Sequence, residues 1–292
     1  MTEHRVHIDG RTVAVHECGD PSGVPLIHFH GTPGSRLETV FGAGLAERAG
    51  VRVIGFDRPG YGRSDAGPIS LAGVSRDVEA IADHLGLGTF AVSAWSGGGA
   101  FALATAAALP GRVLRVGVSG GLAPYEGRPG ARESLTPNDL DALSHLPGDP
   151  ARAAEVFRTG NAAFLDAMLS VRDDESAPWV DWMFAGSDTG VIADPDARRA
   201  LFVNFREALR RGADAIAWDN VAFVGPWGFR VEDVAAPVLL WYGDDDEMAP
   251  PDHGRWLASH LGSAHLTVYA GEGHLLPLAH WDEMLRALTA SA

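Results

Sequence analysis

Ser96 stands in a stretch that could turn a serine into a nucleophile. Residues 90–104 read FAVSAWSGGGAFALA, which predicts a short apolar strand, a sharp glycine-rich turn and an alanine-rich helix. A serine hydroxyl is a poor nucleophile until a strained turn presents it and a neighbouring base removes its proton. Such turns usually read G-x-S-x-G, and here the outer positions are Ala94 and Gly98, a departure of one methyl group. We therefore interpret Ser96 as a nucleophile.

A glycine-rich loop ahead of a helix can instead cradle a phosphate. The Rossmann pattern G-x-G-x-x-G is not met, because the three glycines form one block after the serine. A P-loop would need a lysine at the start of the helix, and none stands there. The nucleophile hypothesis is the better one, and it requires a base, an acid and oxyanion donors elsewhere in the chain.

A histidine and several acids follow two later apolar runs. His274 ends the motif GEGH (271–274), and the motif GDDDEMAP (243–250) precedes it in the chain. The order of serine, acid and histidine is that of the α/β-hydrolase triad, unlike that of chymotrypsin or subtilisin. We therefore expect His274 to act as the base. Three other histidines fall on predicted helices, where we expect surface residues: His253, His260 and His280.

The acid is chosen from a group of neighbouring carboxylates. We assign Asp246, while Asp244 and Asp245 lie closer to the end of the strand and stay open. Adjacent aspartates could also bind a hard cation, but such a site takes ligands from several loops, and we find no second acidic cluster. No metal is therefore expected. In the α/β-hydrolase architecture, the acid can instead follow the strand that we expect at residues 113–119. No carboxylate appears after that run until Glu126, which supports the choice of Asp246.

The rest of the sequence predicts how these loops meet. On each side of Asp9-Gly10 apolar and polar residues alternate, a pattern that predicts a β-hairpin. Further along the chain, apolar runs alternate with helical segments. This alternation predicts an α/β fold with a mostly parallel central sheet of about eight strands flanked by helices. The expected strands cover residues 6–8, 12–15, 26–29, 51–56, 90–95, 113–119, 238–242 and 265–269. Parallel strands end at one edge, so the loop HGTPGSR (30–36) and the Ser96 turn can meet there.

A long segment without predicted strands interrupts the sheet. Its expected helices include residues 151–168, 177–186, 194–211 and 214–223. A helical insertion of this kind is typical of a lid, so we divide the chain into a core, 1–121 and 226–292, and a lid, 122–225. Most aromatic residues of the lid should form its own core, and some should line a substrate pocket. Candidates for substrate contact are Trp95, Trp179, Trp182, Met183, Phe184 and Met248.

The amino-acid composition and the net charge limit the kinds of binding partner that we expect. The chain has 292 residues, of which 46% are hydrophobic and 21% charged, as in ordinary globular proteins. A net charge of −15 repels nucleic acid and anionic membranes, so we expect neither as a partner. The single cysteine, Cys18, excludes an internal disulfide. With no signal-peptide pattern and no run of 18 apolar residues, we expect a cytoplasmic protein, either a monomer or a homodimer.

Taken together, these motifs resemble the α/β-hydrolase fold superfamily. The matching pieces are HGTPGSR (30–36), FDRPGYGRSD (56–65), AWSGGG (94–99), GDDDEMAP (243–250) and GEGH (271–274). They reach both ends of the chain, so the resemblance covers the whole catalytic core. The lid matches only in position and helical content.

The resemblance implies a role for each site residue. Ser96 would be the nucleophile, His274 the base and then the acid, and Asp246 the group that orients the imidazole. The backbone N–H groups of Thr32 and Gly97 would form the oxyanion hole, and no cofactor is needed. The resemblance further implies that Asp57 and Arg58 brace their turn, and we expect the ring of His30 to do the same for the loop that it opens.

A serine nucleophile implies an acyl-enzyme, which disfavours the epoxide hydrolase and dehalogenase branches, whose nucleophile is an aspartate. We expect hydrolysis of a small or medium uncharged carboxylic ester or related acyl compound. C–C bond hydrolysis, perhydrolysis and amide cleavage stay open. HGTPG is one residue from the HGGPG of proline iminopeptidases, but AWSGGG does not match their nucleophile turn, so aminopeptidase activity is kept as a minor alternative. A non-catalytic ligand-binding module is the alternative of another class.

We predict that hydrolysis declines below about pH 6.5, because the base must be a neutral imidazole and an unperturbed imidazole titrates there. The measurement is the initial rate as a function of pH. A rate that stays flat down to about pH 4 would contradict a histidine base.

Overall fold

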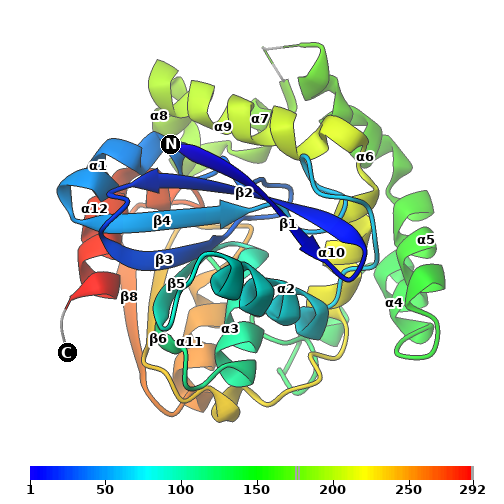
Figure 1. Ribbon diagram of the computed structural model, residues 1–292. Coiled ribbons are helices and arrows are strands. Elements are labelled where there is room, and N and C mark those ends of the chain that lie inside the picture. The colour runs from blue at the N-terminus through cyan, green and yellow to red at the C-terminus, as the bar shows by residue number, and fades with distance from the viewer. Residues whose placement is uncertain (175, 177, 291–292) are drawn as a thin grey trace.

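The core of the protein is an eight-stranded sheet. The computed structural model describes residues 1–174, 176 and 178–290, and its strands have the order β1-β2-β4-β3-β5-β6-β7-β8 (Figure 1). The predicted hairpin is β1 (Thr2–Ile8) and β2 (Arg11–Gly19), and β2 pairs antiparallel with β4 (Val51–Phe56). The other strands pair in parallel: β3 (Val24–Phe29), β5 (Phe90–Trp95), β6 (Val113–Ser119), β7 (Val238–Gly243) and β8 (Ala264–Tyr269). The predicted mostly parallel α/β sheet is therefore confirmed.

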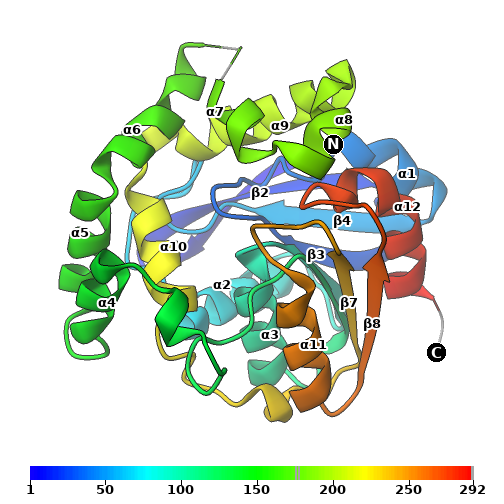
Figure 2. The same cartoon turned by 180° about the vertical axis from the view of Figure 1, so that it is seen from behind.

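Helices cover both faces of the sheet (Figures 1 and 2). On one face lie α1 (Ala43–Arg48), which follows the short turn η1 (Val40–Gly42), and α12 (Leu276–Thr289). On the other lie α2 (Leu71–His84), α3 (Gly98–Ala108) and α11 (Pro251–His260). Every residue of β5 is buried, as expected for a parallel strand enclosed by helices on both sides. The Ser96 turn thus starts from the middle of a rigid core.

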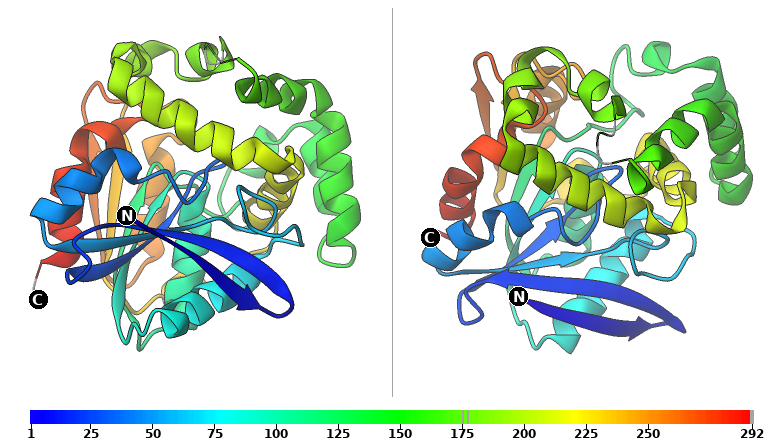
Figure 3. Two further views of the ribbon diagram at one scale, coloured as in Figure 1. Left: turned by 45° about the horizontal axis from the view of Figure 1, so that its top comes forward. Right: turned by 90° about the horizontal axis from the view of Figure 1, so that it is seen from above.

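Between β6 and β7 the chain forms a helical insertion. Its helices are α4 (Pro137–Ser144), α5 (Pro150–Gly160), α6 (Ala162–Leu169), α7 (Pro178–Met183), α8 (Thr189–Ala193), α9 (Pro195–Ala208) and α10 (Asp214–Val224). Short 3₁₀ turns join or flank them: η2 (Arg132–Ser134), η3 (Ser170–Arg172), η4 (Gly186–Asp188), η5 (Leu209–Arg211) and η6 (Val231–Asp233). We call this insertion the lid. In Figure 3 the top of the molecule, as Figure 1 orients it, is turned toward the viewer, and α9 runs across it.

Two lid helices differ from expectation. The predicted helix 151–168 is interrupted at Asn161, which has non-helical backbone angles and stands at both the end of α5 and the start of α6. Its backbone N–H and its side-chain amide both donate to the Phe157 carbonyl, at 3.0 and 2.9 Å. The predicted helix 177–186 begins at a residue outside the described ones, and α7 ends at Met183. The lid limits 122 and 225 stay a prediction. No helix of the described residues is long and apolar enough to cross a membrane.

Candidate active site

Ser96 lies at the sharp turn between β5 and α3. Its φ is +53°, a left-handed conformation that side-chain-bearing residues rarely adopt. Its N–H donates to the Ser119 carbonyl and its own carbonyl accepts from the Gly99 N–H, both at 2.9 Å. Gly98 allows the close approach, since a Cβ there would lie 2.3 Å from the Phe29 carbonyl oxygen. The result is a strained turn around a serine, which is the form of a nucleophile elbow.

Asp246 and His274 meet on the loops that follow β7 and β8. The Nδ1–H of His274 donates to Oδ2 of Asp246 at 2.7 Å, and both side chains are buried. Oδ1 of Asp246 accepts the N–H groups of Met248 and Ala249, each at 2.9 Å. Burial favours the neutral acid, but His274 and these two donors outweigh it and lower the pKa of Asp246. The ionised carboxylate fixes the ring, which leaves Nε2 for proton transfer.

The two neighbouring aspartates have other partners. Asp244 is exposed, and its Oδ1 accepts the Gly271 N–H at 2.6 Å, which braces the loop after β8. Asp245 is also exposed, and its N–H donates to the Glu272 carbonyl at 3.1 Å. Asp246 is thus the carboxylate that pairs with His274.

The loop after β6 lies against both Ser96 and His274. Ser96 is bonded to Ser119, and a Cβ on the next residue, Gly120, would lie 3.1 Å from Nδ1 of His274. The indole N–H of Trp95 donates to the His274 carbonyl at 3.0 Å, and the two rings are 5.7 Å apart. Among the contacts of the described residues, Ser96 and His274 share no hydrogen bond. Catalytic hydrogen bonds are often long without substrate and tighten when it binds.

Gly97 and the loop of Gly31 and Thr32 lie close together next to Ser96. A Cβ on Gly97 would lie 2.6 Å from Oγ1 of Thr32, and a Cβ on Gly31 would lie 3.6 Å from Cβ of Ser96. In the part of the chain that the structure describes, neither the Thr32 N–H nor the Gly97 N–H has an acceptor. Gly97 also caps the N-terminus of α3, where the helix dipole favours negative charge. Paired free donors of this kind are what an oxyanion requires.

A buried ion pair holds the Thr32 loop against the lid. Nε and Nη2 of Arg58 donate to Asp219 of α10 at 2.9 and 2.5 Å, and neither side chain is exposed. The same guanidinium donates to the carbonyls of His30 and Gly31, at 2.7 and 2.9 Å. The hydroxyl of Thr32 donates to Asp219 at 2.7 Å. Core loop and lid helix therefore share one charge pair, and the sequence-based expectation that Arg58 braces a turn fits this geometry.

Glu38 is a second buried group that supports the same loop. Its carboxylate accepts the Gly31 N–H at 3.0 Å, Nε2–H of His28 at 2.9 Å and the side-chain amide of Asn204 at 3.0 Å. Asn204 belongs to α9, so a second lid helix is tied to this loop. The backbone that precedes the Thr32 N–H is thereby held by both Arg58 and Glu38.

Two buried histidines, His30 and His253, form hydrogen bonds with backbone groups. His30 donates from Nδ1 to the Gly31 carbonyl at 2.8 Å and accepts the Arg58 N–H at Nε2, and burial lowers its pKa well below the usual value. The expectation that His253 lies on the surface is wrong. It is buried, accepts the Ala123 N–H at 2.9 Å, and burial lowers its pKa to about 4. The helical placing was right, but α11 turns this position inward.

A cavity of about 750 Å³ opens beside the Asp246–His274 pair. Three of the predicted contact residues line it: Trp182, Met183 and Met248. Four further carboxylates line it as well: Asp188, Asp244, Asp245 and Glu247. The lining residues that the structure describes include no arginine or lysine. The cavity therefore combines apolar surface with strong negative charge.

The other predicted contact residues lie elsewhere. Trp179 is buried with its ring 5.0 Å from that of Phe205, and Phe184 stacks on the same ring at 6.2 Å. Both belong to the apolar interior of the lid. Trp95 is buried against the His274 loop, as described above. The cavity thus brings together three of the six candidates.

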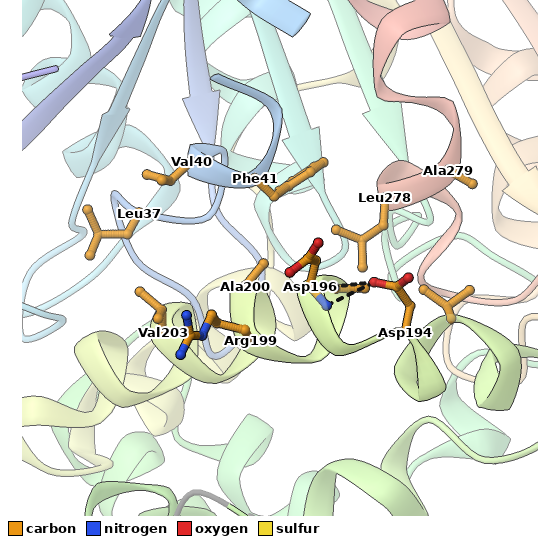
Figure 4. A pocket seen from close by; sticks show the side chains of 12 residues that line it. Leu37, Val40, Phe41, Asp194, Asp196, Arg199, Ala200, Val203, Leu278 and Ala279 are labelled. Atoms are coloured by element: carbon orange, nitrogen blue, oxygen red, sulfur yellow. Dashed lines mark hydrogen bonds between the residues drawn. The ribbon is translucent and has the colours of Figure 1, made fainter. Parts of the chain in front are cut away.

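A second cavity, of about 650 Å³, lies between α9 and the core, and Figure 4 shows the side chains that line it. Its walls are mainly apolar, with Leu37, Phe41 and Leu278 on one side and Ala200 and Val203 of α9 on the other. No member of the Ser96, Asp246 and His274 group lines it. It is a groove at the seam between lid and core.

The fold and this site define an α/β hydrolase. The chain matches the alpha/beta hydrolase fold family over residues 24–280 and belongs to that family. It is 25% identical to a 2-hydroxy-6-oxononadienedioate/2-hydroxy-6-oxononatrienedioate hydrolase of Klebsiella pneumoniae, over 94% of this chain and 88% of the relative.

Two solved structures share the fold. A bromoperoxidase from Bacillus anthracis has a TM-score of 0.73 at 20% identity and covers 98% of both chains. The esterase EaEST from Exiguobacterium antarcticum has a TM-score of 0.70 at 18% identity, again over 98% of both chains. At these identities the likeness shows the fold alone.

Sequence reasoning missed the lid carboxylates at the site. Asp219 did carry a signal, since it is an acid within the apolar helix DAIAWDNVAFV, and such an acid needs a buried partner. Asp188 carried none, because it stands in a short turn and its partner His274 is 86 residues away.

We predict that Asp219→Ala lowers the free energy of unfolding by about 3–5 kcal/mol, because it leaves the Arg58 guanidinium buried and unpaired. The measurement is urea denaturation followed by circular dichroism. Glu155→Ala is the control, since it removes one partner of the half-exposed pair with Arg152 and should cost about 1 kcal/mol or less. Equal losses in the two variants would contradict the importance of the buried pair.

Proposed function

We propose that the protein is a serine hydrolase that cleaves small or medium, uncharged carboxylic esters through an acyl-enzyme on Ser96. The observation that carries this proposal is the elbow serine beside two unpaired backbone donors, with a buried Asp246–His274 pair on the neighbouring loops. Each part of an acyl-transfer site is present in one place.

The proposed reaction has two halves. Oγ of Ser96 attacks the carbonyl carbon while Nε2 of His274 takes its proton, and the oxyanion accepts the N–H groups of Thr32 and Gly97. The imidazolium then gives the proton to the leaving alcohol oxygen, and the acyl group stays on the serine. A water molecule, deprotonated by the same nitrogen, releases the carboxylic acid and restores the serine. Asp246 stabilises the imidazolium in both halves.

The charge next to His274 supports an uncharged substrate, although Ser96, Thr32 and Gly97 are not among the described residues that line the cavity there. Asp188, Asp244, Asp245 and Glu247 line the space beside His274, and the whole chain carries a net charge of −15. A carboxylate on the substrate would be repelled both at long range and inside the cavity. Trp182, Met183 and Met248 offer apolar contact instead.

C–C bond hydrolysis is the second candidate, and the sequence similarity to the Klebsiella pneumoniae enzyme favours it. That enzyme is named for a dienedioate, a substrate with two carboxylates. Such a dianion suits the acidic cavity of this chain poorly. We therefore rank ester hydrolysis first.

We predict that the wild-type protein hydrolyses p-nitrophenyl esters and that Ser96→Ala reduces kcat by about 10³-fold or more. Release of p-nitrophenol from the acetate to the decanoate gives the rate and sizes the acyl pocket. Ser144→Ala, which changes an exposed lid serine, should retain the wild-type rate. The p-nitrophenyl butyrate should also be turned over faster than the p-nitrophenyl hemisuccinate, because only the latter carries a carboxylate.

Three results would redirect the assignment. Equal rates in Ser96→Ala would exclude Ser96 as nucleophile. Absence of ester turnover in folded protein, together with loss of the chromophore of a 2-hydroxy-6-oxodienedioate, would favour C–C cleavage. Failure of both substrates and of a serine-directed fluorophosphonate would favour a binding module.

A further inference from the structure

The carboxylate of Asp188, in the lid, accepts hydrogen bonds from the backbone of His274, the proposed base, and of the next residue. Its Oδ2 accepts the His274 N–H at 2.8 Å and its Oδ1 accepts the Leu275 N–H at 3.0 Å. The carboxylate is 4% exposed, so water competes little with these bonds. One lid side chain therefore holds two consecutive peptide units at the position of the imidazole.

These two donors would otherwise lie unpaired at a helix start. His274 and Leu275 directly precede α12, which has no side-chain cap of its own. The first N–H groups of a helix lack partners within the helix, and the dipole of the helix favours a negative charge at this end. Asp188 supplies both the acceptor and the charge, and it does so from a segment 86 residues earlier in the chain.

The lid and the histidine loop fit closely around this contact. A Cβ on Gly273 would lie 2.5 Å from the carboxylate of Asp188 and from the hydroxyl of Ser187. The Ser187 hydroxyl donates to the Asp245 carbonyl at 3.3 Å. The turn η4 thus touches both loops that carry the Asp246–His274 pair, and Asp188 also lines the cavity beside it.

We propose that Asp188 is a positioning residue, which fixes the backbone of His274 from the lid so that its imidazole faces Ser96. This inference rests on the proposed function, since it assigns His274 as the base. Both oxygens of Asp188 are occupied by backbone donors, so the residue acts through His274 rather than on the substrate. The lid is then part of the catalytic apparatus as well as a cover.

The test compares Asp188→Ala and Asp188→Asn with the lid control Asp166→Ala, an exposed acid. Three readouts are taken: kcat and KM for p-nitrophenyl butyrate, the rate of labelling by a fluorophosphonate, and amide hydrogen exchange of the peptide that contains His274 and Leu275. Asparagine keeps the shape and one acceptor oxygen but loses the charge, so this variant also serves where alanine impairs folding.

We expect Asp188→Ala to lower kcat and the labelling rate by about 10- to 100-fold, the range for partners that orient a functional side chain. KM should change by less than about twofold, and exchange of the two amides should accelerate. Asp188→Asn should fall between wild type and alanine, and Asp166→Ala should match wild type.

Wild-type rates of labelling and turnover in Asp188→Ala would overturn the inference, as would a raised KM with unchanged kcat, which would place Asp188 on the substrate. A wild-type protein that resists labelling would instead overturn the proposed function. In that case the amide exchange still decides whether Asp188 holds the loop.

Discussion

The buried ion pair between Arg58 and Asp219 is the contact on which the arrangement of the reaction centre depends. Two charges out of water are stable only when each is paired and its remaining donors and acceptors are satisfied. Arg58 meets this need by bonding the carbonyls of His30 and Gly31, and Asp219 by bonding the hydroxyls of Thr32 and Tyr61. The requirement to satisfy one charge pair thus fixes the backbone that presents the Thr32 N–H.

The same principle recurs around the site. Glu38 joins the Thr32 loop to Asn204 of α9, and Asp188 joins the histidine loop to η4. In each case a buried carboxylate bridges two segments far apart in sequence. A lid held in this way constrains the core loops, and the lid has an apolar interior of its own around Trp179 and Phe205. Hydrogen bonds of buried carboxylates therefore connect lid and core around the proposed active site.

Local sequence rules predicted most of the core. Period-two runs, buried apolar runs and the elbow motif are short-range signals, and they located the eight strands and the turn at Ser96. The acidic loop and His274 stand at the carboxyl ends of neighbouring parallel strands, which explains why they meet, but the strand ends did not distinguish Asp246 from Asp244 and Asp245. The interruption at Asn161 was missed, because apolar periodicity continues across a single residue with non-helical backbone angles. The inward position of His253 and the contacts of Asp188 were missed because they depend on tertiary packing, which has no local signature.

Mapping the residue that a fluorophosphonate modifies decides whether Ser96 is the nucleophile. After reaction with the folded protein, tandem mass spectrometry of the peptides identifies the modified residue, and His274→Ala serves as the matched variant. We expect one adduct, on Ser96, in the wild-type protein. We expect little or none in His274→Ala, since the serine needs its base. An adduct on another residue, or none in folded wild-type protein, would contradict an acyl-transfer mechanism through Ser96.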